Sequence, residues 1–165
     1  MVREKSEKTA AIILVTIMLT VSAFYTPDWN VVGLRHDSTL IARCIYSFLH
    51  VSILHAAINS WCLLGLTFGY HIKTWQFVTA YIIAVSAPSF TAMDFPTVGL
   101  SVICFAIFGI ITPTVCNPLR FVAYITPMLI GGFFLPQVNA KIHLYGFIAG
   151  VFVGLLNMPI KCKKK

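Results

Sequence analysis

Six long stretches without any charged side chain divide this chain of 165 residues. Each stretch is between 19 and 29 residues long, and only short charged segments separate most of them. A helix that crosses a lipid bilayer needs about 20 mostly apolar residues, so every stretch is long enough to span. The stretches cover residues 9–27, 44–72, 74–93, 95–119, 121–140 and 142–160.

The composition argues against other classes of protein. Hydrophobic residues make up 58% of the chain and charged residues 10%, whereas a soluble domain has roughly 45–50% apolar and about 25% charged residues. The stretches do not alternate apolar and polar residues as barrel strands do. We therefore expect an all-α integral membrane protein with six transmembrane helices in a single domain, residues 1–165. The expected spans are approximately 9–27, 48–70, 74–92, 98–115, 120–136 and 140–158.

The basic residues predict how the chain is oriented. Six spans place both termini on one side, and that side holds nine of the 12 Lys and Arg residues, leaving Arg35, Arg43 and Lys141 on the other. Short cytoplasmic segments are enriched in Lys and Arg, so both termini are expected to be cytoplasmic. The net charge of +7 then reflects span ends facing anionic headgroups, and we expect the bilayer, and no nucleic acid, as a partner.

The first stretch has a second interpretation. Basic residues followed by AAIILVTIMLTVSA are also typical of a signal peptide, with a possible cleavage site near Ala23. An ordinary first helix is favoured because five more spans follow and no soluble domain requires export.

The five cysteines predict neither a disulfide framework nor a metal site. Cys44 is expected outside, Cys62 and Cys104 within spans, and Cys116 and Cys162 near the inner face. Their spacing matches no paired metal-ligand motif. We expect free thiols and no bound metal.

Polar side chains are costly inside a membrane span, and the second span contains two histidines and an asparagine. His55 and Asn59 are four residues apart and share one helix face, while His50 lies nearer the outer end. Such residues can serve a reaction, or they can form hydrogen bonds between helices that contribute about 0.6 kcal/mol per pair on average. These residues alone leave both interpretations open.

The fourth and sixth spans each open with a further polar residue. Ser101 follows Gly99, which permits a close backbone approach, although a lone serine in a membrane helix usually bonds back to its own helix. His143 precedes a stripe of small residues at Gly146, Gly150 and Gly154. Such a stripe lets two helices pack closely, so the neighbouring helix also meets His143.

The expected depths bring these side chains to one level. At about 1.5 Å per residue, Ser101 and His143 lie roughly 5 Å below the outer ends of their helices, and His55 and Asn59 about 10–15 Å along theirs. We therefore expect all four in the outer half of the membrane. A serine nucleophile, a histidine base and donors for an oxyanion are the parts of nucleophilic acyl transfer.

In this order, the three motifs resemble those of the rhomboid intramembrane serine proteases. That family has H-x-x-x-x-H-x-x-x-N on its second helix, G-x-S-G on its fourth and H-x-x-G-x-x-x-G on its sixth. The resemblance extends over residues 40–157. The matching residues are His50, His55, Asn59, Gly99, Ser101, His143, Gly146 and Gly150.

The resemblance implies a role for each of these residues. Ser101 attacks the scissile carbonyl of a transmembrane protein substrate, and His143 accepts and returns the proton. His55, Asn59 and the Ser101 backbone N–H stabilise the oxyanion, and His50 supports the outer end of the second helix. No metal or cofactor is needed. The implied setting is a bacterial inner membrane with the site facing the outer side.

The resemblance also implies how substrates reach the site. They enter sideways, with the fifth span as a gate and the connection Phe134–Lys141, which contains Pro136, as a cap. They unwind near helix-breaking residues, because an intact helix hides its carbonyls.

The sequence departs from the family pattern beside the candidate serine. Val102 stands where the family has a second glycine, and Phe105 where it usually has a tyrosine stacked on the catalytic histidine. Phenylalanine can still stack on His143 but has no hydroxyl. The first outer loop contains Trp29 and Arg35 but not the adjacent Trp-Arg pair common in the family.

Three alternatives follow. Val102 and Phe105 favour an inactive rhomboid-like protein that binds transmembrane helices without cutting them. The short chain resembles the rhombosortases, which would act on C-terminal sorting tails of exported proteins. The histidines His50, His55 and His143 could instead form the relay of a small transporter, although the spans contain no acidic partner for it.

Overall fold

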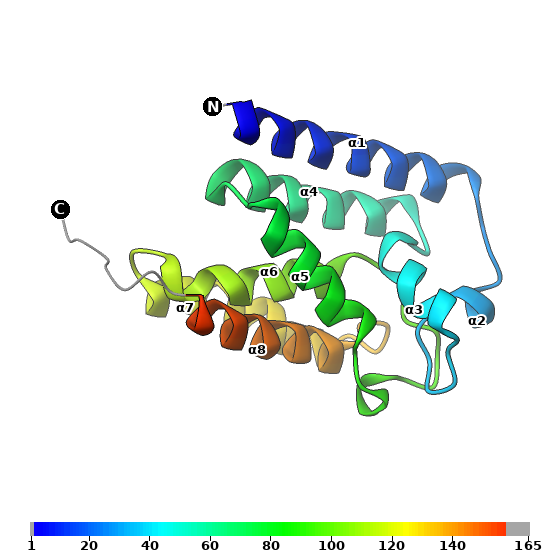
Figure 1. Ribbon diagram of the computed structural model, residues 1–165. Helices are drawn as coiled ribbons and strands as arrows, with labels where there is room; N and C mark the ends of the chain where they lie inside the picture. Colours follow the sequence, from blue (N-terminus) through cyan, green and yellow to red (C-terminus); the bar gives the residue numbers. More distant parts are fainter. Residues whose placement is uncertain (1, 158–165) are drawn as a thin grey trace.

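The computed structural model describes residues 2–157, and within them the chain is all-helical, with no strand. This confirms the expected all-α class. The longer helices follow the charge-free stretches in order, and short helices fill the first connection (Figure 1). The α-helices are α1 (Val2–Phe24), α2 (Trp29–Val32), α3 (Leu40–Ile45), α4 (Ile53–Tyr70), α5 (Thr74–Val85), α6 (Ser101–Ile111), α7 (Pro118–Gly132) and α8 (Ala140–Leu156). Single 3₁₀ turns occupy Tyr46–Phe48, Ser89–Thr91 and Thr112–Thr114.

The helix boundaries differ from the expected spans where the chain contains helix breakers. α5 ends at Val85 rather than near residue 92, because Pro88 follows three residues later and disfavours helix in the residue before it. α6 begins at Ser101 rather than at residue 98, because Gly99 has a φ of 121°. α4 begins at Ile53, five residues after the expected start.

Length and composition identify two helices as candidate membrane spans among the described residues. They are the segment Glu4–Phe24 of α1 and the whole of α4. The apolar helices Thr74–Val85 and Ala140–Leu156 and the segment Ser101–Thr114 are shorter. The structure therefore confirms the helical class, whereas the six membrane spans stay a prediction.

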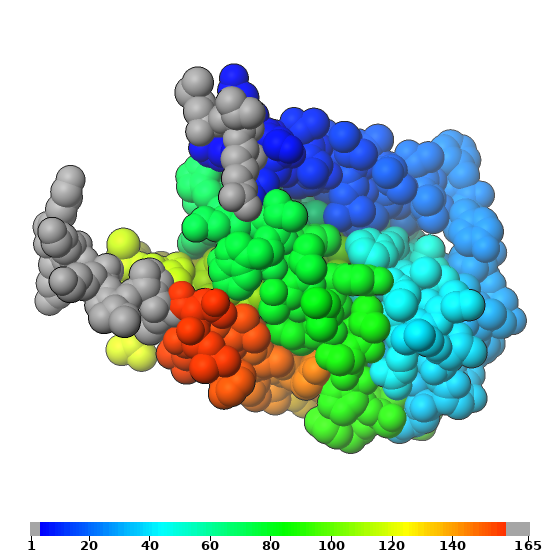
Figure 2. Space-filling model, viewed as in Figure 1, coloured from blue at the N-terminus to red at the C-terminus, as the bar shows by residue number. Residues whose placement is uncertain are grey.

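The two ends of the described chain lie towards the same side of the molecule. α1 begins and α8 ends at the same end of the molecule, on the left in Figure 1. The connection of residues 26–48, which carries α2 and α3, forms a continuous mass at the opposite end (Figure 2).

α6 is the central helix of the bundle. Nine of its eleven residues are buried, and it packs against α4, α5 and α8. Its buried residues are Val102, Ile103, Cys104, Phe105, Ala106, Ile107, Gly109, Ile110 and Ile111.

The glycine stripe of α8 lies directly against the backbone of α6. A Cβ atom added at Gly146 would lie 2.9 Å from a carbonyl oxygen of α6, and at Gly150 or Gly154 it would overlap one. The three oxygens belong to Val102, Ala106 and Ile110. Small residues thus allow the two backbones to touch, as expected of such a stripe.

Val102 fits into this contact. It is buried, and its Cγ2 atom would lie 3.2 Å from a Cβ at Gly146, so the missing side chain of that glycine leaves room for it. The valine at this position therefore does not separate α6 from α8.

We predict that Gly150→Ala destabilises the protein by roughly 1–3 kcal/mol, the usual cost of overpacking, because its methyl group would overlap the Ala106 carbonyl. The matched control is Gly65→Ala on α4, where a Cβ meets nothing within 4 Å and alanine favours the helix by about 0.5–1 kcal/mol. Thermal unfolding in detergent measures both. Equal midpoints would contradict the packing described here.

Candidate active site

Ser101 and His143 form a hydrogen-bonded pair where α6 and α8 begin. Ser101 is the first residue of α6 and His143 the fourth of α8, and the distance from Ser101 Oγ to His143 Nε2 is 2.7 Å. The sequence placed Ser101 about one turn inside its helix, so its terminal position is a correction. Because the first N–H groups of a helix have no acceptor within it, the Ser101 N–H is available to a ligand.

Phe105 packs against the imidazole ring of His143 and positions it. It lies one turn after Ser101, and its ring stacks on that of His143 with centroids 4.6 Å apart and planes 24° apart. His143 is only 9% exposed. The ring is therefore held between α6 and α8 with Nε2 directed at the serine.

His55 and Asn59 approach the serine from α4. A Cβ added at Gly99 would lie 2.8 Å from Cε1 of His55 and 3.6 Å from Nδ2 of Asn59, so both side chains pack against the backbone two residues before Ser101. The Asn59 amide donates one hydrogen bond to the His55 carbonyl at 3.1 Å. An amide has two N–H donors, which leaves one for another acceptor.

Gly99 is required here for two reasons. Its φ of 121° is a conformation that L side chains rarely adopt, and the nearest atoms of His55 leave no space for a Cβ. The Gly99 N–H donates to the Tyr46 carbonyl at 3.0 Å, which fixes the turn.

His50 holds the next residue of the same loop. It is buried, and its Nε2 accepts a hydrogen bond from the Leu100 N–H at 3.3 Å. Its ring also meets that of His55 edge-on, with centroids 5.0 Å apart. The expected support of the second helix by His50 stays a prediction, and the hydrogen bond of this residue is with the loop that leads into Ser101.

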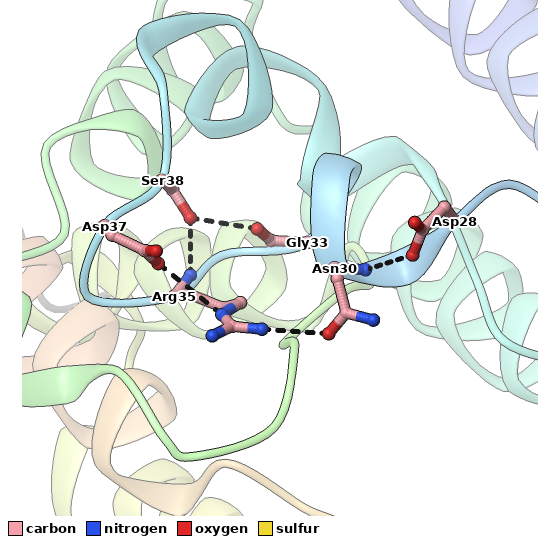
Figure 3. A network of polar contacts seen from close by, with 6 residues as sticks. All are labelled: Asp28, Asn30, Gly33, Arg35, Asp37 and Ser38. Atoms are coloured by element: carbon pink, nitrogen blue, oxygen red, sulfur yellow. Dashed lines mark hydrogen bonds and ion pairs between the residues drawn. The ribbon is translucent and has the colours of Figure 1, made fainter.

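The connection between α1 and α4 also supports this loop. Leu34 and Thr97 exchange both backbone hydrogen bonds, at 2.8 and 3.0 Å. Figure 3 shows a network of polar contacts within residues 28–38, on both sides of Leu34 in the chain. Arg35 donates to the Asn30 side chain at 2.9 Å, and the Ser38 hydroxyl donates to the Gly33 carbonyl at 2.9 Å.

Asn139 is a buried residue of this region that the sequence analysis did not identify. Its amide nitrogen donates to the Thr91 carbonyl and to the Thr97 hydroxyl, both at 2.9 Å, and its oxygen accepts the Ile142 N–H at 3.2 Å. It therefore caps α8 and ties the helix that carries His143 to the loop that precedes Ser101. Asparagine is a common N-cap residue, so its place just before the sixth expected span could have indicated the cap from the sequence.

An open cavity of about 890 Å³ lies beside the pair. Ser101, His143, His55 and Asn59 line it together, and no Asp or Glu is among the described residues that do. Residues of α7 and of the segment 135–139, which includes Pro136, form its other side. The fifth expected span and the expected cap therefore both border the cavity.

The described residues contain no group of three or more His, Cys, Asp or Glu side chains that could hold a metal ion. What the cavity does assemble is a serine, a histidine and N–H donors. This set can deprotonate a hydroxyl and receive a developing negative charge.

Comparisons with models of protein families, with curated proteins and with solved structures find no match to this chain. The geometry of the described residues therefore carries the functional conclusion.

We predict that Asn139→Ala destabilises the protein by about 1–3 kcal/mol, because the buried Thr91 carbonyl and the Ile142 N–H lose their partner. The control is Asn157→Ala at the other end of α8, whose amide bond to the Val153 carbonyl is exposed and whose loss should stay within about 0.5 kcal/mol. Thermal unfolding in detergent separates them. A small effect at Asn139 would show that the cap does not hold α8 in place.

Proposed function

We propose that this chain is a rhomboid-type intramembrane serine endopeptidase that cleaves transmembrane proteins with a Ser101–His143 dyad. The observation that carries this proposal is the 2.7 Å contact between Ser101 Oγ and His143 Nε2 in a cavity that His55 and Asn59 also line. A hydrogen-bonded nucleophile and base with an oriented third group is the signature of covalent catalysis, and Phe105 supplies the third group here.

The first half of the reaction forms an acyl-enzyme. Ser101 Oγ bonds to the scissile carbonyl carbon while its proton moves to His143 Nε2, and the carbonyl oxygen becomes an oxyanion. The Ser101 N–H and the side chains of His55 and Asn59 donate to that oxyanion. The carbon–nitrogen bond then breaks, and His143 gives its proton to the leaving amine.

The second half releases the other product. A water molecule loses a proton to His143 and attacks the acyl carbon. The bond from this carbon to Ser101 Oγ then breaks, His143 returns the proton to Ser101 Oγ, and the product leaves with a carboxyl group. The cavity supplies the room for this water. Neither half requires a metal or cofactor.

A lipid bilayer as the surrounding medium is supported by the side chains at the surface. α1 lies along the surface of the molecule (Figure 2), and of its described side chains only Ala11, Val15 and Met18 are buried. On α4, Trp61 is 81% exposed. Soluble monomers rarely expose contiguous apolar patches larger than a few hundred Å², so we assign this surface to lipid.

We propose that α1 and α4 to α8 are the six spans, with cytoplasmic termini and the outer connection above Ser101. α6 has 11 residues, roughly 16 Å at about 1.5 Å per residue, whereas the hydrocarbon core is about 30 Å thick. A helix this short starts inside the membrane. Ser101 therefore lies at the depth of a substrate span, on the outer side of a bacterial inner membrane.

The same residues suit two related functions. A rhombosortase-like enzyme would use the same dyad on the sorting tails of exported proteins, and an inactive relative would bind transmembrane helices without cutting them. The packing of Val102 against Gly146 and the stack of Phe105 on His143 favour an active site over the inactive relative.

We predict that a fluorophosphonate probe labels the detergent-solubilised protein at Ser101, because His143 activates the hydroxyl. Ser101→Ala and His143→Ala should each abolish labelling, measured by gel fluorescence and peptide mass. Ser86→Ala, which removes the hydroxyl of an exposed serine outside the cavity, should leave labelling unchanged. A folded wild-type protein without labelling would favour the inactive relative or a transporter.

We predict that Asn59→Ala lowers the rate of substrate cleavage by about 10²–10³, the usual cost of one oxyanion donor. Its neighbour Ser60→Ala is the matched control on the same helix, because the buried Ser60 hydroxyl has no hydrogen-bond partner among the described residues. Cleavage of a transmembrane reporter in liposomes gives both rates. Equal rates would remove Asn59 from the proposed oxyanion pocket.

A further inference from the structure

Two cysteines line the inner part of the cavity. Cys62 lies three residues after Asn59 on α4, and Cys104 lies three residues after Ser101 on α6. Each is therefore about one helical turn, roughly 4.5 Å, along its helix from a residue of the candidate site. The proposed reaction uses neither of them.

The helices that carry the two thiols pack against each other, and the thiols interact across this contact. Both are free, Cys104 is buried, and Cys62 is partly accessible and borders the cavity. The other described cysteines, Cys44 and Cys116, do not line this cavity. The cavity thus contains a pair of adjacent thiols, one on each of two helices.

We propose that Cys62 and Cys104 are a redox-modification site, which a small disulfide entering the cavity converts to a disulfide between α4 and α6. The outer side of a bacterial inner membrane is an oxidising environment in which such bonds persist. The effect on Ser101 rests on the function proposed above, whereas the formation of the bond does not.

The chemistry is two successive exchanges. The Cys62 thiolate attacks one sulfur of the small disulfide, which forms a mixed disulfide and releases one small thiol. Cys104 then attacks the Cys62 sulfur, which forms the internal bond and releases the second small thiol. The two cysteines are oxidised, the small disulfide is reduced, and both thiol protons end on the two small thiols.

A disulfide between Cys62 and Cys104 would affect the candidate site, which lies about one helical turn away. A disulfide joins its two sulfurs at about 2.05 Å, so its formation draws α4 towards α6 one turn after Asn59. A misplacement of about 1 Å can cost a hundredfold in rate. Oxidation should therefore lower the reactivity of Ser101 by at least tenfold.

The test uses the full chain with Cys44→Ser, Cys116→Ser and Cys162→Ser, so that only the pair remains; Cys162 lies outside the described residues. The protein is treated in detergent with hydroxyethyl disulfide, alkylated and mapped by mass spectrometry, and a parallel sample is labelled with the fluorophosphonate probe. We expect a peptide linked through Cys62 and Cys104, and at least tenfold weaker labelling that dithiothreitol restores.

Single substitutions show whether the bond causes the loss. Cys62→Ser, or Cys104→Ala if the first variant does not fold, should keep full labelling in the presence of the oxidant. A mixed disulfide that never closes would overturn the proposal, and so would a closed bond with unchanged labelling. If Ser101 is unlabelled even when reduced, the hydrolase function fails, and the linked peptide alone then decides whether the thiols are a redox site.

Discussion

The backbone contact between α6 and α8 is the constraint on which the candidate site depends. Gly146, Gly150 and Gly154 place α8 directly against carbonyl oxygens of α6. Because the helices are this close, Oγ of Ser101, the first residue of α6, lies 2.7 Å from Nε2 of His143, the fourth residue of α8. Larger side chains in the stripe would move the axes of α6 and α8 apart. The short side chain of Ser101 would then no longer reach His143. The hydrogen bond at Ser101 is thus a result of helix packing.

The loop before Ser101 is the second part of this arrangement, and several elements hold it. Gly99 turns the chain beside α4, and His50 binds the N–H of the next residue. Thr97, two residues before Gly99, forms hydrogen bonds with Leu34 in the connection between α1 and α4 and with Asn139, which caps α8. The loop is therefore held by contacts with α4, with the cap of α8 and with the connection between α1 and α4. Such a site is preorganised for a developing charge rather than rearranged by it.

Some of this could be predicted from the sequence because periodicity gives helix faces and their order. The spacing of His55 and Asn59, and of His143 and its glycines, indicates which residues share a face. It does not give distances between helices or the path of a loop. The start of α6 at Ser101 was missed because it depends on the φ of Gly99. Asn139 was missed because an N-cap residue does not reveal which carbonyl and hydroxyl its amide reaches.

The absence of a carboxylate among the described cavity residues raises the question of what stabilises His143 when it is protonated. In a dyad that attacks a carbonyl, the imidazole becomes a cation although its side chain is buried. Phe105 presents the face of its ring to that imidazole at 4.6 Å, and the face of an aromatic ring attracts a cation. A tyrosine hydroxyl is not needed for this effect. If Ser101 acts as proposed, the stack therefore both orients the base and stabilises its charged form.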